Sequence, residues 1–452
     1  MKKILIISAV LFFALSAQCE NAKNIILIIS DGGGPATVGL LAQYARYAPH
    51  SPYADRKSYM EKFFDKSAVG YVLTNTYSTL ATDSAASGTQ IATGAWSLPG
   101  NIGVDYNDKP VKTILEYARD AGKSTGLITT VYLQDATPAV FAAHEASRGQ
   151  KEDIAADMFN SGVDVMLGGG AKYFAPFEDK FKAKGYVTAH TKAELESVQA
   201  GKNVKLLGTF ADLEMPFAIY KKENMPALAD MTAKALDILS QNKKGFFLMV
   251  EAGRVDWALH ANDAAAALQE LLELDNTLGY ILNWAANRKD TLVILTADHD
   301  TGGFAFNYHH LDGAAVERAK ANGEVIYEGQ IDYVNPAVFD KLMAQKGMFY
   351  NAQKEFDALP AKQKTVKELA DIFSKTVNGQ IDTSLYKNAK TVEDIQKNYN
   401  AALGITWATQ SHTAAPVPVA AWGATQQSYG GLYHTTDLNK KMMKSFGFGV
   451  SK

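Results

Sequence analysis

Side chains that could hold divalent cations follow apolar segments at widely separated places in the chain. They are carboxylates, imidazoles and hydroxyls: Asp31, Asp135, Thr137, Glu251, Asp256, His260, Asp298, His299 and His412. Oxygen and imidazole donors suit Zn²⁺, Mg²⁺ or Mn²⁺. The set therefore indicates a metal site built from distant segments. Taken singly, Asp31 is also typical of a turn, because Asp-Gly is a common turn pair, and His299 of a buried structural histidine.

Two of these residues, Asp256 and His260, have the spacing i and i+4. Side chains with this spacing lie on one face of a helix, one turn apart, so they could chelate a single ion. The same spacing also occurs in ordinary ion pairs on helix surfaces. Glu251, which directly follows the apolar run Phe246–Val250, favours the metal site.

A candidate nucleophile, Ser84, stands in the segment TDSAASGT ahead of a predicted helix of small residues. The N–H groups at a helix N-terminus can stabilise an incoming phosphate. A serine at that position often serves only as the N-cap. The alternative is a metal-bound serine alkoxide that attacks a substrate.

The elements that must position these residues are buried strands alternating with helices. Seven apolar, β-branched runs predict strands covered on both faces: Asn24–Ser30, Ala68–Thr74, Thr125–Thr130, Val163–Leu167, Phe246–Val250, Thr291–Thr296 and Val417–Trp422. Helices are predicted between them, at Val111–Ala121, Met231–Gln241 and Ala264–Trp284. This alternation predicts the α/β class, a three-layer α/β/α architecture with a largely parallel central sheet. Ligands of such sheets bind at the carboxyl ends of the strands.

Two polar stretches fit this alternation poorly. Tyr173–Asn224 is polar and rich in lysine, and residues 310–400 are mostly amphipathic helix, as in Lys364–Thr376. Because apolar strands continue after each, both are interpreted as insertions into one domain that spans residues 20–452. The second insertion is predicted to be a cap over the site or a dimer arm.

Composition and the N-terminal segment limit the partners and the compartment. The 452 residues include 45 basic and 48 acidic side chains, a net charge of −3, so nothing favours nucleic acid or an anionic membrane. A single cysteine, Cys19, excludes a disulfide framework and a cysteine-rich zinc site. Residues 1–19, with Lys2 and Lys3 before an apolar run, predict a secretory signal peptide, and thus a periplasmic or secreted protein without a membrane segment after cleavage. A lipoprotein anchor at Cys19 is the alternative.

Six motifs, in order along nearly all of the mature chain, resemble those of bacterial alkaline phosphatases. They are the Asp-Gly at residue 31, DSAASGT, QDATPA with the later Arg148, EAGRVDWALH, TADHDTGG and SHT. The resemblance implies an alkaline phosphatase that hydrolyses small-molecule phosphate monoesters to alcohol and inorganic phosphate. It further implies a covalent phosphoserine at Ser84, a broad substrate range, an alkaline pH optimum and a homodimer.

The same resemblance implies two Zn²⁺ ions and one Mg²⁺ ion. Asp256, His260 and His412 match the first zinc site. Asp31, Ser84, Asp298 and His299 match the second. Asp31, Thr137 and Glu251 match the magnesium site, with Asp135 close by through water. Arg148 matches the guanidinium that grips the phosphate, with Asp83 and Trp257 also assigned to substrate binding.

Two positions depart from parts of the family. Trp257 stands where enterobacterial members have Lys and animal members have His, so weaker phosphate retention is expected. Asp135 is of the enterobacterial type, which makes the site a mixture. Arg254 is expected to pair with a nearby carboxylate, and His144 is expected to orient or pack rather than bind a metal.

Other functions remain as alternatives at this point. A phosphodiesterase or sulfatase of the same superfamily is one. No sulfatase-type Cys/Ser-x-Pro-x-Arg segment surrounds Ser84, however, and superfamily diesterases often use Thr as the nucleophile. A secreted zinc-binding or interaction protein with an inactive site is the other.

Overall fold

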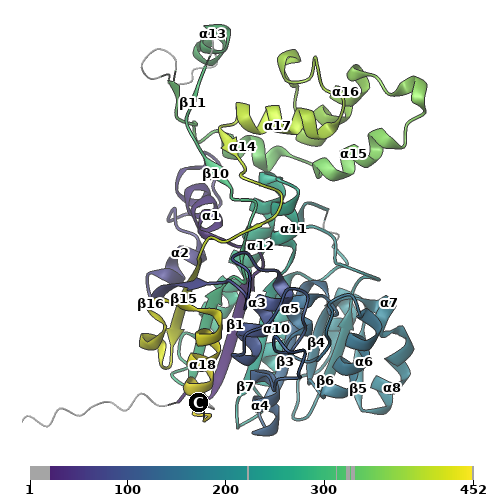
Figure 1. The fold of residues 1–452 in the computed structure, drawn as a ribbon, viewed down its shortest axis with the longest axis vertical. Coiled ribbons are helices and arrows are strands. Elements are labelled where there is room, and N and C mark those ends of the chain that lie inside the picture. The colour runs from purple at the N-terminus through teal and green to yellow at the C-terminus, as the bar shows by residue number, and fades with distance from the viewer. Residues whose placement is uncertain (1–20, 221–222, 312, 322–325, 327–330, 450–452) are drawn as a thin grey trace, which may run out of the picture.

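The computed structural model describes residues 21–220, 223–311, 313–321, 326 and 331–449. The predicted signal peptide, residues 1–19, lies outside them. The described part is elongated, with a sheet and its helices at one end and a group of helices at the other (Figure 1). In the described residues, every helix is too short or too polar to cross a bilayer.

A ten-stranded sheet forms the centre of the larger part. Its order is β16 (Gly431–His434), β2 (Ala68–Leu73), β15 (Val417–Gly423), β8 (Thr291–Thr296), β1 (Asn24–Ser30), β7 (Phe246–Ala252), β3 (Ser124–Tyr132), β4 (Val165–Gly169), β6 (Lys205–Thr209) and β5 (Tyr186–Ala189). All neighbouring strands are parallel except β15, which runs antiparallel to β2 and β8. The predicted largely parallel sheet is confirmed.

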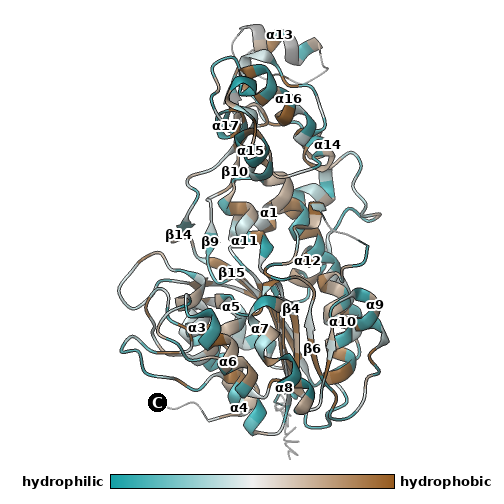
Figure 2. Ribbon diagram, turned by 90° about the vertical axis from the view of Figure 1, so that its right-hand side faces the viewer, coloured by the Kyte–Doolittle hydropathy of each residue, from teal (hydrophilic) through white to brown (hydrophobic). Residues whose placement is uncertain are grey.

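Helices cover both faces of this sheet, which confirms the three-layer architecture. Along β1, alternate side chains enter different hydrophobic cores: Ile26 and Ile28 join one, Ile25 and Ile29 the other. The first core contains α1 (Pro35–Tyr47), α10 (Leu228–Leu239) and α12 (Ala264–Ala285). The second contains α3 (Ser84–Thr93), α4 (Ile114–Asp120), α6 (Lys151–Ser161) and α18 (Thr435–Ser445). Figure 2 shows the sheet edge-on between these layers. Strands buried on both faces need no polar residues, which explains most of the continuous apolar runs. The prediction is wrong for β2, where Val69, Tyr71 and Leu73 are exposed on one face near the edge of the sheet.

The remaining elements are short and mostly lie in connections. The helices are α2 (Tyr59–Phe64), α5 (Ala136–Ala139), α7 (Ala171–Phe174), α8 (Glu178–Ala183), α9 (Lys192–Ser197) and α11 (Arg254–His260). The strands are β9 (Asp300–Thr301), β10 (Ala305–Phe306), β11 (His309–His310), β12 (Ile331–Asp332), β13 (Ile405–Thr406) and β14 (His412–Thr413).

The interpretation of Tyr173–Asn224 as an insertion is wrong. This stretch provides β6, which pairs in parallel with β4, and β5, which pairs in parallel with β6. Both strands are short. Strand β5 is the edge strand, where Val187 is exposed, whereas β6 lies between β4 and β5 and is mostly buried. A short edge strand needs few apolar residues, and the five residues of β6 give a weak signal among the surrounding lysines. The equally short edge strand β16 was missed for the same reason.

Residues 310–400 contain α13 (Gly313–Ala321), α14 (Val338–Ala344), α15 (Phe349–Asp357), α16 (Val366–Val377) and α17 (Val392–Ala402). Helices α15, α16 and α17 pack around a hydrophobic core of their own that includes Phe349, Phe373 and Ile395. Figure 1 shows them at the end of the molecule opposite the sheet.

One buried carboxylate joins this helical part to the helix that follows the site. Asp263 caps the N-terminus of α12 by accepting the Ala266 N–H at 3.1 Å. It also accepts the Gln345 side-chain amide at 2.9 and 3.0 Å, and the Phe349 N–H at 3.2 Å. Three donors from two parts of the chain therefore depend on one side chain.

Asp263→Ala should destabilise the protein by about 3 kcal/mol, because buried donors left without an acceptor cost about 1–3 kcal/mol each. Urea unfolding measures the free-energy change. Asp237→Ala, which removes an exposed carboxylate from α10, is the matched control and should have little effect. Equal, small changes in the two variants would contradict the role given to Asp263.

Candidate metal centre and active site

Three neighbouring strands end at the site. In the parallel trio β8-β1-β7, Ile29 is level with both Glu251 of β7 and Thr296 of β8. Asp31 and Asp298 follow the ends of β1 and β8 by one or two residues. The strand order therefore brings three carboxylates from distant segments to one edge of the sheet, as the sequence predicted.

A first group of ligand atoms consists of Asp256 and His260 on α11 and His412 on β14. His260 Nε2 lies 3.3 Å from Asp256 Oδ2, and His412 Nε2 lies 3.7 Å from Asp256 Oδ1. His412 reaches the group because β14 pairs with β9, where it is level with Thr301. The i and i+4 spacing on α11 thus joins the buried Asp256 to a partly exposed His260 beside His412, a group of three ligand atoms and not an isolated ion pair.

The hydrogen bonds of the two imidazoles show that this group suits a cation. His260 Nδ1 lies 2.6 Å from the Gln410 carbonyl, and His412 Nδ1 lies 2.8 Å from the Thr82 carbonyl. A carbonyl only accepts, so each Nδ1 carries the proton and each neutral ring has its lone pair on Nε2. The two Nε2 atoms are 3.0 Å apart. Two lone pairs this close repel unless a proton or a metal ion lies between them, and backbone partners of this kind orient histidine ligands in metal sites.

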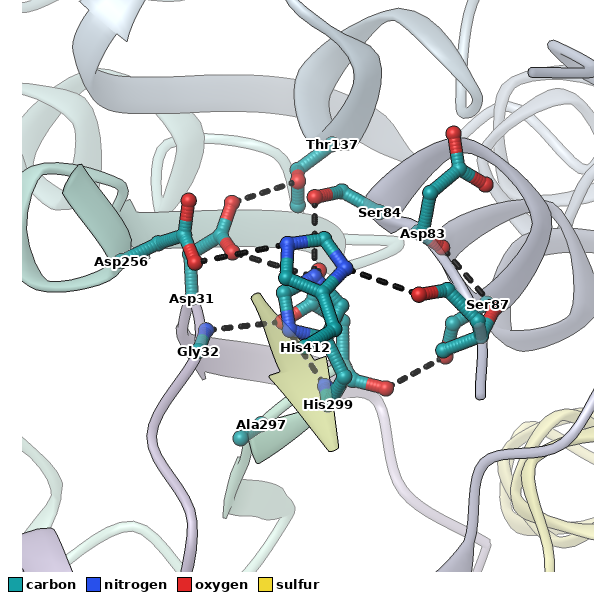
Figure 3. A network of polar contacts seen from close by, with 12 residues as sticks. Asp31, Gly32, Asp83, Ser84, Ser87, Thr137, Asp256, Ala297, His299 and His412 are labelled. Carbon is teal, nitrogen blue, oxygen red and sulfur yellow. Dashed lines mark hydrogen bonds and ion pairs between the residues drawn. The ribbon is translucent and has the colours of Figure 1, made fainter. Parts of the chain in front are cut away.

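A second group surrounds His299, which is fully buried. Its Nε2 lies 3.2 Å from Asp298 Oδ2, 3.6 Å from Asp31 Oδ1 and 3.1 Å from Ser84 Oγ (Figure 3). Thr301 donates its hydroxyl proton to Asp256 at 2.6 Å and so accepts from His299 Nδ1 at 3.2 Å. The lone pair of His299 is therefore also on Nε2, facing the carboxylates.

A third group contains Glu251, Asp31 and Thr137. Both Glu251 carboxylate oxygens are buried and have no hydrogen-bond partner. The same is true of Asp31 Oδ1 and Asp298 Oδ2. Thr137 donates to Asp31 Oδ2 at 3.2 Å. Buried carboxylate oxygens without donors are costly, and they are the donor set of a hard cation. Among the described residues, the ligand atoms of Asp256, His299 and His412, and those of Asp31, Asp298 and His299, lie within 4.8 Å of one another, so the donors present suit divalent cations here.

The electrostatics of the cluster confirm an excess of buried negative charge. Burial, with smaller contributions from neighbouring carboxylates, raises the pKa of Glu251 to about 8 and that of Asp298 to about 6. Burial and the nearby Asp298 also raise the pKa of Asp31. Burial raises the pKa of Asp256 as well, but the surrounding imidazoles outweigh it and lower that pKa to about 2. Divalent cations would offset this repulsion and displace the protons.

Ser84 does not serve as the cap of its helix, and its hydroxyl lies beside His299. Asp83 is the N-cap of α3 and accepts the Ala86 N–H at 3.0 Å, while Ser84 is the first helical residue. The Ser84 hydroxyl faces His299, and Ser84 lines a cavity of about 800 Å³. Asp83 thus provides the N-cap, the role that Ser84 could otherwise have had. The Ser84 oxygen is therefore available as a nucleophile.

Arg148 lines the same cavity and is held by two carboxylates. It donates to Asp83 Oδ2 and to Asp135 Oδ1, each at 3.2 Å. Asp135 also accepts from Lys151 at 3.3 Å. Asp83, predicted to bind substrate, does not line the cavity; it positions Arg148 instead. Lys151 is a site residue that the sequence reasoning missed, although its place one turn after Arg148 was a possible signal.

Other predicted residues fall as follows. Trp257 and His260 line the cavity. His144 contacts Glu116 at 3.3 Å and the Gly103 carbonyl at 2.7 Å, away from the ligand groups, as expected. Arg254 differs from expectation, because among the described residues its guanidinium has no carboxylate within ion-pair distance and stacks on aromatic rings instead.

The α/β/α fold, with a serine hydroxyl beside buried carboxylates and imidazoles, is the arrangement of a metal-dependent hydrolase. A family model described as Alkaline phosphatase matches residues 22–447, and this chain belongs to the alkaline phosphatase family. Alkaline phosphatase 4 of Bacillus subtilis (strain 168) is 32% identical over 441 residues, covering 92% of this chain and 87% of the relative.

Two solved structures agree. The cold-active alkaline phosphatase of Shewanella sp. is 30% identical, with a TM-score of 0.76, covering 94% of this chain and 99% of that one. A mutant of TAB5 alkaline phosphatase with Mg bound is 25% identical, with a TM-score of 0.68, covering 96% of this chain and 100% of that one. The protein is thus a phosphatase of a metal-dependent family.

Removal of metal should destabilise the protein, because an ion at about 100 times its dissociation constant stabilises by about 2.7 kcal/mol. EDTA should lower the Tm, and Zn²⁺ should restore it. His412→Gln should reduce the zinc found by elemental analysis, whereas His434→Gln should not. His434 is the matched control, since it contacts a backbone carbonyl, that of Asn75 at 2.8 Å, outside the cluster. Equal zinc in both variants would disprove the assignment of His412.

Proposed function

We propose that this protein hydrolyses phosphate monoesters of small alcohols through a covalent phosphoserine at Ser84. The observation behind this proposal is that Ser84 Oγ, the Arg148 guanidinium and the ligand groups meet in one cavity. A planar guanidinium can donate two parallel hydrogen bonds to a phosphate. The doubly charged group of a monoester benefits from this more than the singly charged group of a diester.

Two Zn²⁺ ions and one Mg²⁺ ion would be held by the three ligand groups. Asp256, His260 and His412 would hold one zinc. The other would be held by Asp31, Ser84, Asp298 and His299. The magnesium ligands would be Asp31, Thr137 and Glu251, with Asp135 nearby through water. The ions would supply the positive charge that lowers the pKa of the serine hydroxyl and stabilises the phosphoryl and leaving oxygens.

The metal set is supported by the donor chemistry and by one relative. The Nε2 atoms of His260 and His412 face each other, and Glu251 has two unpartnered oxygens. The TAB5 mutant with bound Mg supports magnesium at one site. In this chain, Asp135 already accepts from Arg148 and Lys151, so its main effect would be to orient the guanidinium.

In the proposed reaction, Ser84 Oγ loses its proton and attacks phosphorus. The bond from phosphorus to Ser84 forms as the bond to the alcohol oxygen breaks, and the alcohol leaves with a proton. Water then attacks the phosphoserine, which releases inorganic phosphate and restores the hydroxyl. Arg148 holds the phosphoryl oxygens in both steps, where most of the acceleration should come from charge stabilisation.

An alkaline optimum and a broad substrate range are part of the same proposal. A serine hydroxyl attacks only as it loses its proton. The rate should therefore rise with pH and level off once the hydroxyl is fully deprotonated. The cavity of about 800 Å³ extends well beyond Ser84 and Arg148. It could therefore admit alcohols of many shapes.

We further propose the setting in which the enzyme works. Residues 1–19 would direct it to the periplasm or the exterior and be removed, leaving one domain of residues 20–452. The protein would act as a homodimer. The helical residues 310–400, which have a hydrophobic core of their own, would form a cap or a dimer arm.

Ser84→Ala should reduce p-nitrophenyl phosphate hydrolysis by about a thousandfold or more, since losing a nucleophile removes the covalent route. Ser87→Ala is the matched control on the same helix. Its hydroxyl donates to the Asp298 carbonyl at 2.6 Å, and its loss should change kcat by less than about tenfold. Mass spectrometry of acid-quenched enzyme should find phosphate on the peptide with Ser84. Undiminished turnover by metal-loaded Ser84→Ala would end the proposal.

Trp257→Lys should tighten inhibition by inorganic phosphate by about fivefold, because an ammonium at this position adds a favourable charge interaction of about 1 kcal/mol. Trp257→Gln removes the ring without adding charge and serves as the control. The inhibition constants of the two variants are compared at one pH and ionic strength. The same constant for both would show that charge at position 257 does not affect phosphate retention.

A further inference from the structure

Arg254 is a buried cation in the active-site cavity that the proposed reaction does not use. It is the first residue of α11, and its N–H donates to Thr130 Oγ1 at 3.2 Å. Only 5% of Arg254 is exposed, yet it lines the same cavity as Ser84 and Arg148. The open volume beside this guanidinium is therefore the substrate cavity itself.

Two aromatic rings hold this guanidinium. Its central carbon lies 3.7 Å from the centre of the Phe217 ring and 4.6 Å from that of the Trp257 ring. Both rings line the cavity as well. Stacking fixes the plane of a guanidinium without using its N–H donors, which point outward from the edge of that plane.

Those donors have no acceptor within the described residues. Arg254 Nε is buried without a hydrogen-bond partner. No described carboxylate lies within 4.0 Å of the guanidinium. The buried Glu270 and the cavity-lining Glu214 are close enough to favour its charged form through space, but neither accepts a hydrogen bond from it, and burial lowers the pKa of Arg254 to about 10. By contrast, Arg148 in this cavity is held by two carboxylates, at 3.2 Å each.

An unpaired buried charge is costly to a fold. Removing one partner of a buried ion pair typically costs about 3–5 kcal/mol, whereas a desolvated cation–π contact returns about 2 kcal/mol. Stacking on Phe217 and Trp257 thus offsets only part of the cost of Arg254. An anion that enters the cavity would supply the acceptors that the chain does not.

We infer that Arg254 forms a second anion subsite, which selects phosphate monoesters whose alcohol part bears another anionic group, such as a carboxylate. This inference rests on the proposed function and specifies its substrate class. The Ser84 end of the cavity would bind the phosphate, and Arg254 would donate hydrogen bonds to the anionic end of the leaving group. Trp257 would act as a positioning residue that presents the guanidinium.

Two other charged residues of the cavity should also change the preference for anionic leaving groups, in opposite directions. Glu214 lines the cavity near Arg254 and would repel the second anion. Lys354, an exposed residue stacked on Tyr350 at 4.2 Å, would attract it weakly from the mouth. Glu214→Gln should therefore favour anionic leaving groups, opposite to the loss of Arg254.

The experiment compares paired substrates with the metal-loaded full chain. Phosphoglycolate and its longer ω-carboxyalkyl homologues are each matched with the monophosphate of the diol of equal length. The measured quantity is the ratio of kcat/KM for the acid to that for the diol ester. At the length that reaches the subsite, Arg254→Gln should lower this ratio about tenfold or more, as expected for a hydrogen bond to a charged group.

Arg288→Gln is the matched control. Arg288 is an exposed arginine that stacks on Trp284 at 3.9 Å, outside the cavity, and its loss should leave the ratio unchanged. Arg254→Lys, which keeps the charge but loses the planar fork, should retain part of the preference. The change should appear mainly in KM, because the subsite binds the leaving group and does not touch the reacting atoms.

An equal loss for acids and diol esters in Arg254→Gln would make Arg254 structural only and overturn the inference. A ratio that stays at the wild-type value at every chain length would overturn it too. Wild-type enzyme that cleaves none of these esters would instead refute the proposed function. The diol esters and p-nitrophenyl phosphate thus separate the two failures.

Discussion

Mutual repulsion among buried carboxylates is the constraint around which the site is built. Asp31, Glu251 and Asp298 stand at the ends of three adjacent parallel strands, and burial raises the pKa of each. Like charges this close in a low-dielectric interior are unfavourable unless cations neutralise them. The sheet places these carboxylates together, and several of their oxygens have no hydrogen-bond partner. This arrangement lowers the stability of the fold without metal but increases its affinity for cations.

The rest of the fold keeps these groups from relaxing away from one another. Strand β1 is clamped by hydrogen bonds to β7 and β8 and by separate hydrophobic cores on its two faces. Thr301 fixes His299, and backbone carbonyls fix His260 and His412. A close-packed interior resists movement, so the cluster cannot reduce its repulsion by spreading out. Protons, or cations that displace them, are the remaining means of neutralising it.

The sequence predicted what depends on local pattern. The bounds of β1 and β8 agree with their apolar runs, because a strand buried on both faces must be apolar throughout. The convergence of Asp31, Glu251 and Asp298 could be predicted because the ends of such strands meet at one edge of the sheet. The edge strands β5 and β16 escaped detection because half-exposed short strands need no such pattern, and β6, although mostly buried, has only five residues.

Contacts between residues far apart in the chain could not be predicted from the spacing of residues in the sequence. The distinction between a capping serine and a free one depends on Asp83, which takes the Ala86 N–H. The pairing of Asp135 with Lys151 depends on how α6 approaches the site. For Arg254, charge suggested an ion pair, but Phe217 comes from a distant loop and supplies a ring instead. Sequence patterns predict which groups are present, and tertiary packing decides which partners they have.

The same packing changes how the substitution at position 257 should be understood. Compared with a Lys at this position, Trp257 lacks a positive charge, yet its ring lies against the Arg254 guanidinium. The cavity therefore keeps a cation on this side, but on a planar group held in place by stacking. A flexible ammonium beside the phosphate would favour retention of the product. A fixed guanidinium further along the cavity would favour particular leaving groups, so the two arrangements would use similar charge for different steps of one reaction.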